Sequence, residues 1–159
     1  MKLKYTKIQI ALEIVGLLLI IGMIIFICVR WNQIPQKIPG HYNAMGEIDR
    51  WGSKSEILIM PIVGILLYIF ITIMSFFPLI WNVPIQVTDE NKEAVYLVVK
   101  SLIIFTKIEM LGMFFYINYY TATSQSLPIV FLPVSMMILF GTIIFFILRT
   151  YRTGKKKKV

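Results

Sequence analysis

The residues best suited to bind a ligand are gathered in one polar loop, 34–54, which lies between two long apolar runs. This loop contains the only histidine of the chain, His41. His41 has three interpretations: it binds a ligand or a proton, it coordinates a metal, or it holds the loop together. Zinc sites use three or four N, S or O ligands, and the loop offers one histidine and no cysteine. We therefore expect neither a metal nor a cofactor.

Prolines and turn-forming residues predict that the loop is ordered. Pro35 and Pro39 fix their own φ and push each preceding isoleucine toward extended backbone. Residues 34–39 are therefore expected to be stiff and extended. Gly46 permits a turn conformation, and Asn43 can close an Asx turn.

The second half of the loop is expected to return the chain to the membrane interface. Asp49 indicates a further turn, and Trp51 is more typical of an interface anchor than of a stacking platform. Ser53 or Ser55 could then cap the following helix, with Glu56 in its first turn.

Charged side chains also fall inside the apolar runs, at Glu13, Lys100, Lys107 and Glu109. A charge at the centre of a bilayer costs about 2.5–3.5 kcal/mol on insertion scales. Lys100 can extend its ammonium toward the cytoplasmic face, whereas Lys107 is expected near the midplane. Glu13 is the obvious acid for Lys100 or Lys107.

Glu109 lies on a different helix face from Lys107 and needs another partner, for which His41 and Arg50 of the loop are candidates. Two interpretations of these intramembrane charges stay open. Either their pairs fix the packing of the helices, or they line a polar cavity that connects the loop with the middle of the bundle.

Composition predicts an all-α integral membrane protein. Of the 159 residues, 58% are hydrophobic, against about 45–50% in a soluble domain, and they occur in continuous runs. A membrane-spanning helix needs about 20 mainly apolar residues. We expect one membrane domain over residues 1–159, in which four spans form a compact bundle. The expected spans are 8–29, 57–80, 96–120 and 127–148, with a motif loop over 30–56 and a basic tail over 149–159.

The distribution of Lys and Arg predicts that both termini are cytoplasmic and that the loop is extracellular. The formal net charge is +8. With this orientation the cytoplasmic segments carry ten cations and the outer loop four. The cytoplasmic ten are Lys2, Lys4, Lys7, Lys92, Arg149, Arg152 and Lys155–Lys158. A basic tail directly after an apolar span is typical of a membrane-surface anchor, so no nucleic acid is expected as a partner. The lipid bilayer is the expected partner, and a homodimer stays open.

The loop residues also carry a family resemblance. The spacing Pro-x-x-x-Pro-x-His-x-Asn-x-x-Gly, between the first two spans, resembles a membrane domain of the bacterial SdpI-like bacteriocin immunity family. The resemblance covers about the first 80 residues. It implies a bacterial cell membrane location and the signature positions Pro35, Pro39, His41, Asn43, Gly46 and Asp49. Family members with assigned roles protect a cell from its own secreted toxin peptide, and some sequester a transcriptional repressor. Longer members carry further spans.

Three functions follow as hypotheses. The first is an immunity protein that binds a toxin peptide through the outer loop. Its expected ligand-binding residues are Pro35, Pro39, His41, Asn43, Gly46, Asp49, Trp51 and Lys54. The second is a small transporter or ion pathway that uses Lys107 and Glu109, and the third is an accessory subunit that acts through its basic tail. An enzyme is not expected, because the sequence shows no Ser/His/Asp set, phosphate loop or metal cluster.

Overall fold

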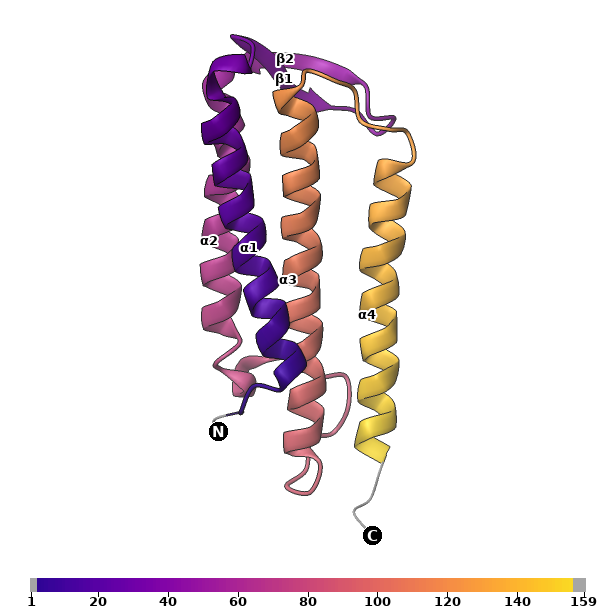
Figure 1. Ribbon diagram of the computed structural model, residues 1–159. Coiled ribbons are helices and arrows are strands. Elements are labelled where there is room, and N and C mark those ends of the chain that lie inside the picture. Colours follow the sequence, from indigo (N-terminus) through magenta and orange to yellow (C-terminus); the bar gives the residue numbers. More distant parts are fainter. Residues whose placement is uncertain (1–2, 156–159) are drawn as a thin grey trace.

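Four long helices lie side by side in the computed structural model, which describes residues 3–155 (Figure 1). They are α1 (Lys7–Arg30), α2 (Ile59–Met74), α3 (Lys92–Ala122) and α4 (Phe131–Lys155). By length and composition, three segments can cross a membrane: Lys7–Gln33, Lys54–Met74 and Phe131–Lys155. The all-α membrane bundle expected from the sequence is therefore confirmed.

The longest helix, α3, is the centre of the packing. Helices α1, α2 and α4 each contact it, and α1 also contacts α2. Both of its lysines within the apolar run, Lys100 and Lys107, are only 1% exposed. The other helices turn apolar side chains outward along their length, as expected for surfaces that face lipid.

Several helix boundaries differ from the expected spans. Helix α2 ends at Met74 rather than at 80, because Pro78 forces Phe77 out of the helical region and opens a short 3₁₀ helix, Pro78–Ile80. Helix α4 begins at Phe131 rather than at 127, since Pro128 disfavours helical backbone at the residue before it.

Helix α2 also begins at Ile59, two residues inside the expected span 57–80. The other boundaries lie outside the expected spans 8–29, 96–120 and 127–148. Helix α1 is one residue longer at each end, α3 runs from Lys92 to Ala122, and α4 continues into the basic tail as far as Lys155. Of the cations expected on the cytoplasmic side, Lys2 and Lys156–Lys158 lie outside the described residues.

The first helix has a complete cap at its beginning. The hydroxyl of Thr6 accepts a hydrogen bond from the backbone N of Gln9 at 3.2 Å, and the Gln9 amide oxygen accepts one from the Thr6 backbone at 3.1 Å. The Gln9 amide nitrogen also donates to Leu97 and Ser101 of α3. One buried side chain therefore joins the beginning of α1 to the central helix.

The polar loop between α1 and α2 forms a β-hairpin, which the sequence did not predict. Strand β1 (Lys37–Tyr42) pairs antiparallel with β2 (Ile48–Ser53), with irregular register on both sides of His41. The hairpin covers one end of the bundle (Figure 1). Ile38 of β1 is fully buried beneath it, in a cluster with Met23 of α1 and Ile57. The hairpin is therefore packed onto the helices.

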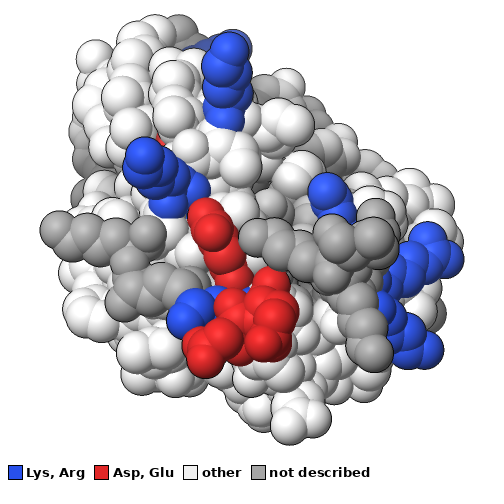
Figure 2. Space-filling view, turned by 90° about the horizontal axis from the view of Figure 1, so that it is seen from below, with Lys and Arg blue, Asp and Glu red and all other residues white. Residues whose placement is uncertain are grey.

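The opposite end of the bundle carries a second group of charged residues. Figure 2 shows acidic side chains gathered at this end, with Lys and Arg around them. Asp89 and Glu93 flank the beginning of α3. Lys92 donates a hydrogen bond to Asp89 at 2.8 Å, which lowers the pKa of that carboxyl group.

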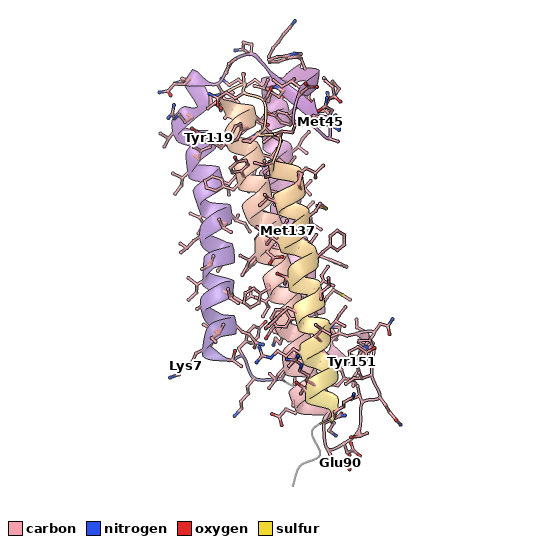
Figure 3. The ribbon with its side chains drawn as sticks, turned by 90° about the vertical axis from the view of Figure 1, so that its right-hand side faces the viewer. Lys7, Met45, Glu90, Tyr119, Met137 and Tyr151 are labelled. Atoms are coloured by element: carbon pink, nitrogen blue, oxygen red, sulfur yellow. The ribbon has the colours of Figure 1, made fainter. Side chains whose placement is uncertain are left out.

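The hairpin lies at one end of the bundle, and the loop before α3 lies at the other. Met45 of the hairpin and Tyr119 of α3 lie at one end, and Lys7, Glu90 and Tyr151 lie at the other (Figure 3). The beginning of α1 and the end of α4 lie at the end of the bundle opposite the hairpin (Figure 1). This is expected for a chain whose termini lie on one side of a membrane.

Candidate functional site

A cavity of about 540 Å³ lies between the hairpin and the helix ends beneath it; we call it the hairpin cavity. This volume is within the range of about 300–1,000 Å³ that is typical of small-molecule sites. Its wall contains residues from the hairpin, from the beginnings of α2 and α4, and from the end of α3. They include Pro39–Ala44, Gly46, Glu56, Ile57, Ile59, Met60, Ile117, Asn118, Thr121, Leu127, Pro128, Phe131 and Leu132.

Half of the loop residues expected to bind a ligand line this cavity. Pro39, His41, Asn43 and Gly46 are in its wall. The other four, Pro35, Asp49, Trp51 and Lys54, are not among the lining residues.

The tip of the hairpin is an Asx turn closed by Asn43, as its sequence indicated. The Asn43 amide oxygen accepts hydrogen bonds from the backbone N–H groups of Met45 at 2.9 Å and Glu47 at 3.0 Å. The Asn43 amide nitrogen donates to the Glu47 carboxylate at 2.8 Å. These bonds fix the loop tip, so the wall that it contributes is preorganised.

Gly46 attaches this tip to the segment before α4. Its φ of +82° lies in the left-handed region that glycine tolerates best. The backbone N–H of Leu127 donates to the Gly46 carbonyl at 2.8 Å. A Cβ at this position would overlap the carbonyl of Leu127. Glycine therefore permits both the turn and the close approach of two backbones.

His41 is oriented by Asp49 across the hairpin. The His41 Nδ1 lies 2.7 Å from the Asp49 carboxylate, and the two side chains are 63% and 43% exposed. In the neutral ring Nδ1–H donates to the carboxylate, which leaves Nε2 as an acceptor. Asp49 therefore positions a histidine that lines the cavity, although it does not line the cavity itself. One carboxylate, that of Asp49, pairs with His41. No cluster of three metal-binding side chains occurs within residues 3–155.

Arg50 of β2 links strand β1 to the turn before α2. Its guanidinium donates to the Gly40 carbonyl and lies 3.0 Å from the Glu56 carboxylate. The other Glu56 oxygen accepts from the backbone N–H of Ser53 at 2.9 Å. Ser53 and Glu56 therefore cap the turn that leads into α2, as the sequence indicated.

Trp51 and Lys54 lie on the outer surface of the hairpin end. Trp51 is 53% exposed, as an interface anchor would be. The Lys54 ammonium lies 4.5 Å from the centre of the Trp31 ring. Both side chains are placed to interact with headgroups or water.

Tyr42 and Asn118 are two of the cavity residues that were not identified from the sequence. The Tyr42 hydroxyl donates to the Gln125 carbonyl at 3.1 Å, and burial raises the pKa of this phenol. Asn118 of α3 is fully buried, and its amide nitrogen donates to the Ile57 carbonyl at 2.9 Å. The only sequence signal for Asn118 is an amide within the apolar run of α3.

Among the intramembrane charges, the expected pair of Glu13 and Lys107 is present. The Lys107 ammonium lies 2.8 and 2.7 Å from the two Glu13 oxygens and 2.8 Å from the Thr72 hydroxyl. Tyr68 donates to Glu13 at 2.9 Å. Side chains of α1, α2 and α3 thus form one polar cluster.

The contacts of the Lys100 ammonium are an aromatic ring and a backbone carbonyl. The ammonium lies 3.3 Å from the centre of the Tyr5 ring and 3.5 Å from the Leu3 carbonyl. It therefore extends toward the beginning of the chain, at the end of the bundle opposite the hairpin.

Glu109 contacts neither His41 nor Arg50, which corrects the expectation from the sequence. Its partner is the Thr142 hydroxyl of α4, which donates to one carboxylate oxygen. Lys107 contacts α1 and α2, whereas Glu109 contacts α4. The two charges consequently do not share a partner, and they do not form one continuous relay.

The match to a known family covers the segment that contains the hairpin. Residues 18–65 match a domain of unknown function, DUF1648. An uncharacterised protein of Archaeoglobus fulgidus is 48% identical over 33 residues, which are 21% of this chain and 18% of that protein. The aligned part is thus less than a fifth of the archaeal protein. No solved structure matches the chain significantly. The domain match includes the whole hairpin, Lys37–Ser53.

Proposed function

We propose that this multi-pass membrane protein is an immunity protein that binds a membrane-active toxin peptide in the hairpin cavity. The observation that carries the proposal is the position of the cavity. It lies at one end of an apolar bundle, where a peptide that approaches the bilayer would first meet the protein. Its wall includes the loop residues that resemble the SdpI-like family, with Pro39, His41, Asn43 and Gly46 among them.

The rigidity of the hairpin supports binding. The Asx turn of Asn43, the Gly46–Leu127 contact and the buried Ile38 hold the wall in place before any ligand arrives. A preorganised site loses less conformational entropy on binding than a mobile one. The largely apolar wall with a few polar groups is also typical of ligand sites.

The proposed orientation places the hairpin outside the cell. In the described residues, the end opposite the hairpin carries six cations and the hairpin end carries four. The six are Lys4, Lys7, Lys92, Arg149, Arg152 and Lys155, and the four are Arg30, Lys37, Arg50 and Lys54. Lys and Arg next to spans favour the cytoplasmic side. In a bacterial cytoplasmic membrane the cavity would then face secreted peptides.

The proposal is tested by survival of a sensitive Gram-positive host. Cells that express the protein are challenged with secreted toxin peptides of the SdpC type and with any small peptide encoded beside this gene. Leu132→Trp fills the cavity from α4, and His41→Ala removes the oriented imidazole. Ile138→Trp, at an exposed position of the same helix that does not line the cavity, is the matched control.

Wild type and Ile138→Trp should protect, and Leu132→Trp and His41→Ala should lose most protection at equal membrane abundance. Protection that is unchanged in both cavity variants would contradict binding in the cavity. Absence of protection by the wild type would contradict the immunity function itself.

A transport function is the alternative. Charged side chains within a membrane span are functional candidates by default, and Glu109 keeps one carboxylate oxygen without a hydrogen bond within the described part of the chain. Proteoliposomes that contain wild type or Glu109→Gln would test it. A flux above that of empty vesicles, reduced by Glu109→Gln, would favour transport.

A further inference from the structure

Asn118, a residue in the wall of the hairpin cavity, has a buried acceptor without a partner in the described residues. Asn118 lines the cavity and is fully buried. Its amide oxygen accepts no hydrogen bond from residues 3–155. Buried polar atoms are nearly always hydrogen-bonded, because an unpaired one has lost its bond to water without a replacement. Asn118 Oδ1 is therefore an exception that calls for an explanation.

The orientation of the amide is fixed by its other contact. The opposite end of the same amide lies 2.9 Å from the carbonyl oxygen of Ile57. A carbonyl can only accept, so the atom that faces it must be the NH₂ group. The unpaired atom is consequently an oxygen, and only a hydrogen-bond donor can satisfy it.

The wall of the cavity is mainly apolar. Ile57, Met60, Ile117, Leu127 and Phe131 contribute to the same wall. A group that enters the cavity must therefore have an apolar body. The volume of about 540 Å³ is large enough for an aromatic side chain.

We propose that the hairpin cavity takes an apolar aromatic group that carries one hydrogen-bond donor, and that this donor binds Asn118 Oδ1. The side chains of Trp and Tyr have this chemistry, with an apolar ring and one N–H or O–H group. Where the aromatic group is a Trp or Tyr side chain of a toxin peptide, this inference rests on the proposed function.

The test compares two probes that differ only in the donor. Indole has one N–H group, and 1-methylindole has nearly the same shape without it. The full-length protein in lipid nanodiscs, with ¹³C-labelled methionine methyl groups, is titrated with each probe. The Met60 signal, assigned from its loss in Met60→Leu, reports on the cavity wall. Partition of each probe into empty nanodiscs corrects its concentration in the bilayer.

Indole should shift the Met60 signal and bind roughly tenfold more tightly than 1-methylindole at equal bilayer concentration. The same preference is expected for p-cresol over 4-methylanisole. Equal affinities within each pair, or no effect of any probe on Met60, would overturn the proposal, and water would then be the partner of Asn118.

The variant Asn118→Leu provides a second comparison. It should remove the preference for indole while 1-methylindole still shifts Met60. The comparison within the wild type stands even if this variant fails to fold. A preference for indole without protection against any toxin peptide would contradict the immunity function alone. Protection without such a preference would contradict only the role of Asn118.

Discussion

The ammonium group of Lys107 binds both carboxylate oxygens of Glu13, with distances of 2.8 and 2.7 Å, inside the membrane-spanning part of the bundle. The lysine side chain is fully buried, and the Thr72 hydroxyl of α2 accepts a further bond. One cation from α3 thereby joins three helices. This explains why the central helix tolerates a charge that lipid would not.

Loss of one member of this pair is predicted to destabilise the protein strongly. Lys107→Met leaves the Glu13 carboxylate without its counter-ion in an apolar environment. The free energy of unfolding should fall by about 3–5 kcal/mol, as is typical when a buried pair loses one partner. Reversible unfolding of the purified protein in mixed detergent and SDS micelles measures this value.

The double variant Glu13→Gln/Lys107→Met is the control for this prediction. It removes both charges, so it should recover much of the loss caused by Lys107→Met. Unfolding of Lys107→Met at the same SDS fraction as the wild type would contradict stabilisation of the bundle by the Glu13–Lys107 pair.

Gly46→Ala is predicted to detach the hairpin tip from the segment before α4. A residue other than glycine at a positive φ costs about 1–2 kcal/mol, and the added methyl group would also overlap the Leu127 carbonyl. Amide hydrogen exchange at Leu127, whose N–H donates to Gly46, should become faster. Gly112→Ala is the matched control, because a Cβ there meets no atom within 4 Å. Unchanged protection of Leu127 in Gly46→Ala would contradict this role.

The hairpin and the 81–91 segment are predicted to lie on opposite sides of the membrane. In a Cys28→Ser background, a membrane-impermeant thiol reagent should label Met45→Cys in intact cells. It should label Glu90→Cys only after lysis. The reverse pattern would contradict the outward orientation of the cavity, and labelling of both positions in intact cells would contradict the bundle's place across the membrane.

The sequence predicted those features that depend on local chemistry or on a large desolvation cost. The apolar runs fixed the number of long helices, because about 20 apolar residues are needed to cross a bilayer. The cost of a charge in lipid identified Glu13 as the acid for Lys100 or Lys107, and Lys107 is its partner. The turn preferences of Asn43 and Gly46 were sufficient to predict the turn at the tip of the loop, because each residue acts on the neighbouring backbone.

Features that depend on distant contacts were not predictable in this way. The hairpin has no simple alternation of apolar and polar residues, and its prolines obscure the strand pattern. Glu109 pairs with Thr142, which is 33 residues away and carries no charge that would mark it as a partner. The position of Asn118 in the cavity wall depends on contacts with the hairpin and with α4. A single amide in an apolar run has no sequence pattern that indicates such a position.

Binding of a toxin peptide in the hairpin cavity is tested most directly by photo-crosslinking of the peptide to the cavity wall. A benzophenone amino acid replaces Leu132, or Ile138 as the control on the same helix, in cells that express the full chain. Cells are illuminated with a tagged SdpC-type peptide or the small peptide encoded beside this gene, whichever the protein protects against. A crosslink that excess untagged peptide competes away is expected at position 132, and little crosslinking is expected at position 138. Equal crosslinking at both positions, or none at 132, would contradict binding in the hairpin cavity.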